Sequence, residues 1–566
     1  MRHILRRVAL KSQLTEKRVP ARKSSRHWKQ KLDSFVSVIK RESRPLSCIS
    51  AIWLFYTVNL IVWELLNKRL LAFDEVNHYF NSIAIAYGLS HPGRFLNLSK
   101  FAQQFAVTHP PIYFDLQLYP PFVYFVTSFL YLVRPPSLPV AATTNSVFMM
   151  VLLLSTYYLS LEFLKSRTCG VVAAFLVGGY PLLTGLSRLY LIDYPLTALV
   201  SLAILLLIRT RYFQKRGTTI ALSAVLIAGM LTRITFPLYV AGPFAYVALR
   251  GLRSRKSVFN MFLTFALASI SGIWYIEGGL RTTTQYYLGG PGPFHYGLGG
   301  FSTSIYSSWN FISLFFGLAI GVALIPLFIV GFLCFLRSAN YRLLLIIGII
   351  FPIVLFGAID HYYFDPRFVA PLLSLAAVAS SAILSLRRSR FIAALAIVLL
   401  VGAQFAAITY APASPWVQPL DSQPTIGMIP PSNEDWKIPQ IISTVLNDSM
   451  ANRINSPKLQ ILVIEPYFDQ TIFDYYAYQM GASLYTVNIA SGPAGVCATN
   501  YVIMKTVGES FVASPQTSAG IEAVQFVRSN LEHFTLIGTY QLPDNSTIGI
   551  YRNDGGLPCP TINATA

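Results

Sequence analysis

Charged residues are scarce in this chain. Only 12% of its 566 residues are Asp, Glu, Lys or Arg, and the acidic residues number 24 against 44 basic ones. Hydrophobic residues make up 54% of the sequence, which is more than a soluble protein of this size needs. The shortage of charge therefore excludes an ordinary soluble globular protein and indicates a chain that crosses a membrane many times.

Cysteine is also rare, with five residues in the whole chain. No C-x-x-C pair occurs, and no His/Cys group has the spacing of a zinc site. Cys48, Cys169 and Cys334 lie in or beside apolar runs, where we expect them to be inert. Cys497 and Cys559 lie in the C-terminal segment and are able to pair if that segment is extracytoplasmic.

The basic residues are concentrated in particular places. The first 45 residues hold 14 Lys or Arg against 3 acids, and most other basic residues lie in short gaps between apolar runs. This distribution follows the positive-inside rule, so the net charge of +20 does not indicate a nucleic-acid partner. We expect residues 1–45 to be a cytoplasmic, largely disordered arm that acts as a topology signal or touches anionic lipid.

Apolar runs predict eleven membrane spans. The run at 122–133 is shorter than the ~20 residues that a crossing helix needs, so we expect an interfacial or half-inserted helix that returns to the outer side. All basic gaps between the later spans, with 15 Lys or Arg and no acid, then lie inside, together with the N-terminus. The predicted spans are near 46–66, 140–164, 169–187, 194–209, 218–234, 236–249, 258–277, 309–336, 343–359, 367–386 and 391–410.

Residues 411–566 differ in composition from the rest. The Pro-rich stretch 411–431 is typical of a linker. Predicted helices then alternate with strands, which indicates a small extracytoplasmic α/β domain over 432–566. The expected elements are helices at 439–447, 470–480 and 519–534, strands at 459–465, 484–489 and 501–505, and a hairpin turning at 543–545. The fold class is thus a polytopic α-helical membrane domain over 46–410, with a first outer loop at 67–139, followed by this domain.

Two adjacent carboxylates, Asp74 and Glu75, follow the first predicted span. The ordinary interpretation is a solvated loop, and the alternative is a catalytic base with an orienting or metal-binding neighbour. Asp193 stands at the start of a later span, five residues after Arg188. Either these two form an ion pair at the membrane edge, or Asp193 faces the same cavity as Asp74 and Arg188 fixes one of the acids.

Two arginines also lie at predicted span ends on the acidic side. Arg233 and Arg367 either extend to the lipid headgroups, as membrane-edge arginines commonly do, or hold a phosphate in a bidentate manner. His109 and His361 are interpreted as headgroup contacts or structural residues. Tyr119 belongs to an aromatic-rich first loop that fits an interfacial belt or a surface for stacking on sugars.

In chain order, these features resemble those of a known family. They are the acidic pair after the first span, a Pro-Pro element before a short apolar run, the Arg-x4-Asp-x-Pro-Leu sequence from Arg188, and the span-end Arg233. The set resembles the GT-C superfamily of integral-membrane glycosyltransferases, with protein O-mannosyltransferases and aminoarabinose transferases acting on lipid A as the nearest types. The resemblance covers roughly residues 46–410, and the α/β tail is similar to the soluble tails of some members.

The resemblance implies inverting transfer of a sugar from a polyprenyl-phosphate donor to an acceptor hydroxyl on the outer face. Asp74 would be the base, with Glu75 beside it and Asp193 as the matching outer acid. The donor phosphate would bind Arg233 or Arg367. The family's Pro-Pro element corresponds either to the one after His109 or to the one after Tyr119, and the second is preferred because an apolar helix follows it directly.

The resemblance further implies a protein, lipid or glycan acceptor and a location in the cell membrane, or in the endoplasmic reticulum membrane of a eukaryote. A divalent metal ion is left open, with Asp74 and Asp193 as its ligands if one takes part. A transporter or lipid flippase is the rival class, but inverted repeats and polar residues near mid-membrane are not seen. A non-catalytic scaffold would leave the acids without a role.

Overall fold

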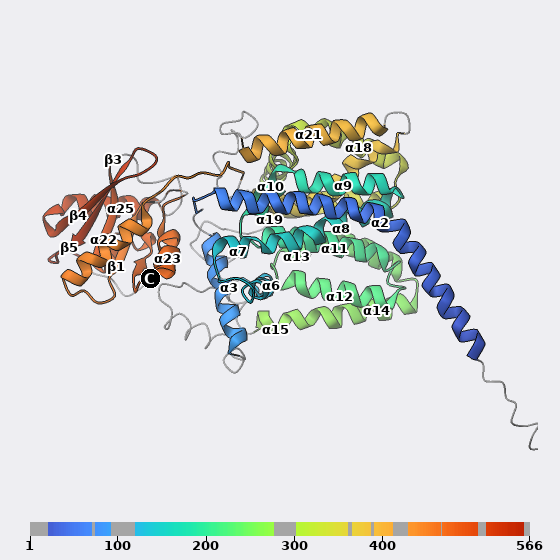
Figure 1. Ribbon diagram of the computed structural model, residues 1–566, viewed down its shortest axis with the longest axis horizontal. Helices are drawn as coiled ribbons and strands as arrows, with labels where there is room; N and C mark the ends of the chain where they lie inside the picture. The colour runs from blue at the N-terminus through green and yellow to red at the C-terminus, as the bar shows by residue number, and fades with distance from the viewer. Residues whose placement is uncertain are drawn as a thin grey trace, which may run out of the picture. The chain divides into compact units, whose positions relative to one another are not determined.

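The computed structural model of the chain describes residues 21–70, 74–91, 119–276, 301–359, 365–386, 390–410, 428–463, 465, 467–507 and 517–559. These residues are largely helical, with one five-stranded sheet near the C-terminus (Figure 1). The chain divides into two compact units, residues 1–51 and 52–566. The boundary between the units falls inside one long helix, α2.

Helix α2 runs from Ala21 to Leu66. Its C-terminal part, Glu42–Leu66, is long and apolar enough to cross a membrane, in agreement with the first predicted span. The prediction of a largely disordered arm is wrong for residues 21–45, because the helix begins at Ala21 and continues without a break. Its many Lys and Arg residues are good helix formers, so a basic composition does not prevent helix formation.

Seven helical segments of the described residues are long and apolar enough to cross a membrane, and an eighth is added if one bent pair counts as a span. The chain is therefore a multi-pass membrane protein. The bent pair consists of α9 (Arg167–Gly179) and α10 (Pro181–Arg188), which meet at a bend of 60°. The seven segments are Glu42–Leu66, Leu138–Leu164, Arg255–Trp274, Thr303–Arg337, Arg342–Ile359, Pro366–Ser385 and Arg390–Tyr410.

These segments contain several consecutive elements. The elements are α7 (Leu138–Ala142), α8 (Thr144–Leu164), α14 (Arg255–Ala268), η1 (Ser269–Ser271), α15 (Gly272–Trp274), α17 (Phe301–Leu314), η4 (Phe315–Gly321), η5 (Val322–Leu324), α18 (Ile325–Ser338), α19 (Arg342–Ile359), η6 (Pro366–Leu372), α20 (Leu373–Ser381), η7 (Ala382–Ser385) and α21 (Arg390–Tyr410). Each corresponds to a predicted span, apart from the short α7, which precedes one.

The predicted count of eleven spans is not confirmed. Helices stand at the remaining predicted positions, but α11 (Asp193–Arg209), α12 (Arg216–Met230) and α13 (Phe236–Gly251) have 17, 15 and 16 residues. A perpendicular crossing of the hydrocarbon core takes about 20 residues. These shorter helices pack among the longer ones, α11 against α8, α12 against α14 and α13 against α19. Eleven spans and their inside–outside orientation therefore stay predictions.

The described part of the first loop contains two helices that pack against each other, α3 (Asp74–Ser90) and α6 (Phe122–Leu130). Helix α6 has nine residues, which agrees with the prediction that this apolar run does not cross. Helix α3 begins at Asp74, so Asp74 and Glu75 form its first turn rather than part of a solvated loop. Carboxylates are stabilised there by the positive end of the helix dipole.

The C-terminal residues form the predicted small α/β fold. Strands β1 (Lys458–Leu462), β2 (Tyr485–Val487), β3 (Tyr501–Val507), β4 (Phe534–Gln541) and β5 (Thr547–Asn553) form one sheet in the order β2-β1-β3-β5-β4. β1 is parallel to β2 and β3, whereas β3, β5 and β4 are antiparallel. β4 and β5 are the predicted terminal hairpin.

Helices cover both faces of this sheet. Because side chains alternate along a strand, Ile503 and Val502 of β3 belong to two different cores. Helices α22 (Ile438–Ala451) and α23 (Gln470–Gln479) contribute to the core that contains Ile503, and α24 (Gly492–Cys497) and α25 (Thr517–Ser529) to the one that contains Val502. Leu70, just past the end of α2, packs against the first core.

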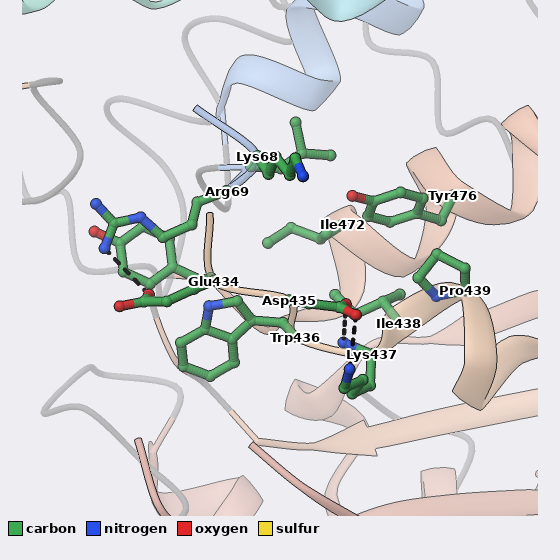
Figure 2. Close-up of a pocket in the computed structure, with 12 residues that line it drawn as sticks. Lys68, Arg69, Glu434, Asp435, Trp436, Lys437, Ile438, Pro439, Ile472 and Tyr476 are labelled. Carbon is green, nitrogen blue, oxygen red and sulfur yellow. Dashed lines mark hydrogen bonds and ion pairs between the residues drawn. The ribbon is translucent and has the colours of Figure 1, made fainter. Parts of the chain in front are cut away.

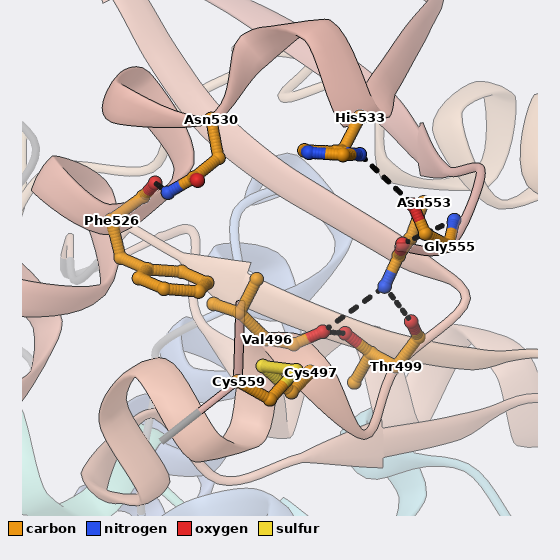
Figure 3. The surroundings of a disulfide bond; sticks show 9 residues. All are labelled: Val496, Cys497, Thr499, Phe526, Asn530, His533, Asn553, Gly555 and Cys559. Atoms are coloured by element: carbon orange, nitrogen blue, oxygen red, sulfur yellow. Dashed lines mark hydrogen bonds between the residues drawn. A yellow bond between two sulfur atoms is a disulfide. The ribbon is translucent and has the colours of Figure 1, made fainter. Parts of the chain in front are cut away.

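A disulfide joins Cys497 at the end of α24 to Cys559, 62 residues later (Figure 3). These two cysteines, which the sequence showed to be able to pair, are therefore joined. Next to it, the Asn553 side chain donates hydrogen bonds to the carbonyl oxygens of Val496 and Thr499. The disulfide and these bonds hold the chain that follows β5 against α24.

Candidate active site

Five charged side chains from distant parts of the chain meet at one place, which we call the acid–arginine cluster. Its members are Asp74, Asp193, Asp365, Arg233 and Arg367. The acids come from the first turn of α3, the first residue of α11 and the residue before η6. The arginines come from the turn between α12 and α13 and from η6. With every group ionised, the cluster carries one net negative charge.

Arg367 contacts all three acids of the cluster. Its Nη1 donates to Asp74 Oδ2 at 2.8 Å and lies 3.9 Å from Asp193 Oδ2. Its Nε donates to Asp365 Oδ2 at 2.6 Å, and its backbone N–H donates to Asp365 Oδ1 at 2.8 Å. Through the bond from the Arg367 backbone N–H, Asp365 acts as the N-cap of η6. The same carboxylate therefore fixes both the first turn of η6 and the Arg367 side chain.

Arg233 is the partner of the most buried acid. One terminal nitrogen of its guanidinium, Nη1, pairs with Asp193, whose side chain is only 2% exposed. The guanidinium also lies over the ring of Phe368, 5.1 Å from its centre. Its Nε makes no hydrogen bond within the described part of the chain, and none joins its Nη2 to that part either. Arg233 therefore holds Asp193 with only part of its donor capacity.

Asp74 is the most accessible member of the cluster, with 36% of its side chain exposed, against 4% for Asp365. Burial by itself raises the pKa of Asp74, but the positive charge of Arg367 and the hydrogen bond from it more than offset this. The pKa of the Asp74 carboxyl therefore lies below its ordinary value. At neutral pH this accessible carboxylate is ionised and able to accept a proton.

Glu75 is not a member of the cluster but fastens the helix that carries Asp74. Its Oε1 accepts a hydrogen bond of 2.8 Å from the backbone N–H of Tyr190, in the turn between α10 and α11. The same turn leads to Asp193, so this bond joins the two acid-bearing segments. Burial raises the pKa of Glu75 to about 7, and the Tyr190 N–H opposes this shift.

The raised pKa of Glu75 predicts a pH-dependent contribution to stability. An unfolded Glu titrates near pH 4.3–4.5, so between about pH 4.5 and 7 the unfolded state has lost a proton that the native state keeps. Stability should therefore fall as pH rises through this window, by about 3 kcal/mol. Glu75→Gln keeps an acceptor for Tyr190 and should remove this fall, as measured by thermal unfolding in detergent from pH 5 to 8. Identical pH dependence in both proteins would contradict the assignment.

Next to Asp74, His78 is held between two tyrosines of the first loop. Its Nδ1 and the Tyr124 hydroxyl lie 2.7 Å apart, and the Tyr119 ring stands edge-on to the imidazole with centres 4.7 Å apart. Burial lowers the pKa of His78 to about 4, so the ring is neutral at neutral pH. Of the two Pro-Pro elements, the preferred one after Tyr119 thus lies beside α3.

Arg188 is directed elsewhere. It donates to Thr409 Oγ1 of α21 and to the Ile429 carbonyl oxygen, and its guanidinium lies over the Trp63 ring. Both roles predicted for Arg188, an ion pair with Asp193 and a contact that fixes an acid of the site, are wrong. Asp193 pairs with Arg233 instead, and Asp74 pairs with Arg367. His109 and His361 lie outside the described residues.

The acids of the cluster do not fit a metal site. In the described ranges, no group of three or more His, Cys, Asp or Glu side chains is arranged to hold a metal ion. Asp74 and Asp193, the expected ligands, face the same guanidinium nitrogen of Arg367. Oxygens that are engaged by a guanidinium are poor ligands for a hard divalent cation, which needs several of them free.

Three residues of this site were not predicted as site residues. Asp365 carried a signal in the sequence, because an Asp before Pro commonly caps a turn and here pairs with the arginine two positions on. His78 lies on the helix begun by the acidic pair, one turn past Asp74. Tyr190 acts through its backbone N–H, which any residue except proline would supply, so no sequence signal marks it.

An apolar cavity of about 490 Å³ lies among α12, α13 and the segment α14–η1. Its walls are almost entirely hydrophobic and include Phe244 and Phe265. Met230 and Phe236, which also line it, stand three residues before and three residues after Arg233 in the chain. The turn between α12 and α13 therefore carries Arg233 of the cluster, and the residues on either side of it form part of the cavity wall.

Solved structures provide the relatives of this fold. No family model and no curated protein matches the chain. ArnT from Cupriavidus metallidurans matches in its apo state with a TM-score of 0.54 at 12% identity, over 88% of this chain and 97% of that one. The same protein bound to undecaprenyl phosphate matches with a TM-score of 0.56 at 11% identity, with the same coverage. The oligosaccharyltransferase AglB from Archaeoglobus fulgidus, in complex with an inhibitory peptide and a dolichol-phosphate, gives 0.45 at 13% identity, over 91% of this chain and 75% of that one.

The similarity to ArnT extends over nearly the whole length of both chains, so it includes the membrane helices and the C-terminal α/β fold together. At 11–12% identity it concerns the fold and not the chemistry. ArnT is an aminoarabinose transferase of the GT-C superfamily. The chain therefore shares the fold of ArnT, in agreement with the resemblance that its ordered sequence features predicted.

Proposed function

We propose that the protein transfers a sugar from a polyprenyl-phosphate donor to an acceptor hydroxyl, with inversion at the anomeric carbon. Asp74 is the general base and Arg233 binds the donor phosphate. The GT-C fold makes this reaction class the first to consider, and the acid–arginine cluster contains both kinds of group that it needs. ArnT has been solved with undecaprenyl phosphate bound, which supports a carrier lipid of this class.

The position of Arg233 is the observation that carries the proposal. The guanidinium adjoins the buried acids on one side, while the turn that bears it also lines the apolar cavity. A polyprenyl phosphate has the same two parts, a phosphate and a long hydrocarbon chain. Because one terminal nitrogen of Arg233 holds Asp193 and the other bonds to none of the described residues, donor capacity remains for a phosphate oxygen.

In the proposed reaction, Asp74 takes the proton of the acceptor hydroxyl while its oxygen forms a bond to the anomeric carbon. The bond between that carbon and the phosphate oxygen breaks, and the electron pair leaves with the polyprenyl phosphate, whose charge Arg233 stabilises. Arg367 keeps Asp74 ionised, and Asp193 positions the two arginines. The acids thus have separate roles, one chemical and one positioning.

We place this reaction on the extracytoplasmic face, with the α/β domain on the same side. The disulfide between Cys497 and Cys559 supports this placement, because disulfides persist in oxidising compartments. The segregation of basic residues into the opposite gaps supports it as well. The membrane is the cell membrane, or the endoplasmic reticulum membrane in a eukaryote, and the acceptor is a protein, lipid or glycan hydroxyl.

Substitution of Arg233 tests the phosphate site. Arg233→Ala removes a charge-assisted contact worth about 1.5–3 kcal/mol, so the donor concentration for half-maximal rate should rise about ten- to 150-fold. Arg233→Lys keeps a cation beside Asp193 but loses the planar fork, and we expect about a tenfold rise without loss of folding. The measurement is consumption of a radiolabelled polyprenyl-phosphate sugar by purified protein at several donor concentrations.

Arg253→Ala, at an exposed position between α13 and α14, is the matched control and should behave as the unmodified protein does. Unchanged donor dependence in a folded Arg233→Lys protein would move the phosphate site elsewhere. A transporter or flippase would move the lipid without consuming it, so absence of any donor consumption with all tested acceptors would argue for that class instead.

A further inference from the structure

A second, smaller cavity of about 150 Å³ is lined by none of the residues of the acid–arginine cluster (Figure 2). One wall is the short segment Lys68–Leu70 that follows α2, and the other is the stretch Glu434–Pro439 that leads into α22. Tyr476 and Ile472 of α23 complete it. The cavity therefore lies where the chain leaves its first membrane span and meets the C-terminal fold.

The walls of this cavity are held together by specific bonds. The backbone N–H of Lys68 donates to the Ser432 carbonyl oxygen at 2.7 Å. Arg69 Nη2 donates to the Pro430 carbonyl oxygen at 2.9 Å, and Arg69 Nη1 pairs with Glu434 at 3.3 Å. The guanidinium of Arg69 also lies over the ring of Tyr467, 4.6 Å from its centre. These contacts make a fixed cavity out of two segments that are far apart in the sequence.

The wall has more hydrogen-bond donors than the protein uses. Arg69 Nε and Trp436 Nε1 are buried without a partner in the described residues. No ion pair or hydrogen bond joins the Lys68 ammonium to those residues either, although its backbone is bonded. Neighbouring atoms cover both nitrogens, so a ligand forms a hydrogen bond with either of them only after the Arg69 or Trp436 side chain rotates. Donors without acceptors indicate a ligand that presents oxygen.

The charge of the lining favours an anion. Glu434 is paired with Arg69 and Asp435 with Lys437, so the Lys68 ammonium is the charge left over (Figure 2). The contact between Arg69 and Glu434 is also replaceable, because 42% of the Glu434 side chain is exposed to water. A stronger oxyanion can therefore take the place of the Glu434 carboxylate at Arg69.

We propose that this cavity binds a phosphate group, with Lys68 and Arg69 as its cationic ligands and Glu434 as the carboxylate that it displaces. Lys68 lies two residues after the end of α2, a helix able to cross the membrane, so the cavity stands at the level where lipid headgroups begin. The phosphate belongs either to a lipid headgroup or to a soluble ion. The proposal does not rest on the sugar-transfer function.

The test is calorimetric titration of the full-length protein in a phosphate-free maltoside detergent. One arm uses inorganic phosphate, and the other uses a short-chain phosphatidylglycerol below its micellar concentration. Lys68→Gln should weaken binding about three- to tenfold because a cation is lost. Glu434→Gln should tighten it about two- to fivefold, because the competing carboxylate is lost.

Two controls separate a local effect from a change in net charge. Lys458→Gln and Glu522→Gln make the same charge changes at exposed positions of β1 and α25, and neither should alter the affinity. If only the lipid binds, and Lys68→Gln and Glu434→Gln change its affinity as expected, the phosphate is that of a lipid headgroup. If both probes bind equally well, soluble phosphate is sufficient. If Lys68→Gln and Glu434→Gln bind both probes as the unmodified protein does, or no more differently than their controls, the proposal is overturned.

Discussion

The Asp74→Asn substitution is expected to lower the rate of sugar transfer about 10²- to 10⁴-fold while leaving the protein folded, as is usual for loss of a general base. The amide keeps the shape of the side chain but does not accept a proton from the acceptor hydroxyl. The carboxylate is available for that role because it is the most accessible acid of the cluster and because Arg367 keeps it ionised. Folding should survive because a third of this side chain already faces water.

The transfer rate should be measured at saturating donor, together with a thermal unfolding curve for each variant. Glu522→Gln removes an exposed carboxylate on α25 and serves as the control for a change of charge. Asp74 would have no part in the chemistry if the folded Asp74→Asn protein transferred sugar at an unimpaired rate. The acid–arginine cluster would then be a structural ion-pair network rather than an active site.

Arg367→Ala should affect both activity and stability, because this side chain contacts all three acids. Without its positive charge, burial dominates at Asp74 and the pKa of that carboxyl rises. Asp74 would then stay protonated to higher pH, so the acid limb of the profile of kcat/KM against pH should move upward by about one to three units. Leaving Asp365 without its cation should also destabilise the fold by about 3–5 kcal/mol.

The size of the stabilisation that Arg367 gives through Asp74 depends on pH. The pairing with Arg367 lowers the pKa of Asp74 in the native state, so its contribution is present above the ordinary pKa of Asp and is lost as pH falls through the lowered value. Arg367→Lys retains a positive charge and should show a smaller shift of the acid limb than Arg367→Ala. An acid limb at the same pH in all three proteins would disprove the electrostatic link between Arg367 and Asp74.

The fold could be predicted from sequence because its determinants are local patterns. Apolar runs separated by basic gaps gave helices at every expected position, and alternating strands and helices gave the α/β fold after residue 432. The number of crossings is a different question, since α11, α12 and α13 are shorter than a full span and their depth depends on their neighbours. The helix over residues 21–45 was missed because composition was taken as a sign of disorder.

The site could be predicted only as a set of residue types on one side of the membrane. Asp74, Asp193, Arg233 and Arg367 do come together, but sequence spacing did not determine which acid pairs with which arginine. Arg188 shows the limit of that reasoning. It is five residues from Asp193, yet the turn between α10 and α11 directs the two side chains to different partners. Pairings between helices depend on how the helices pack, and a linear spacing does not contain this information.

The contacts of α3 determine when this helix is able to complete its packing during synthesis of the protein. Tyr79 accepts a hydrogen bond from Gln479 of α23, 400 positions later, and its ring adjoins that of Tyr475. Ribosomes add about 5–20 residues per second, so roughly 20–80 seconds separate the synthesis of these partners. Arg367, the partner of Asp74, is itself 293 positions downstream. The helix that begins with Asp74 thus leaves the ribosome well before the residues that complete its surroundings.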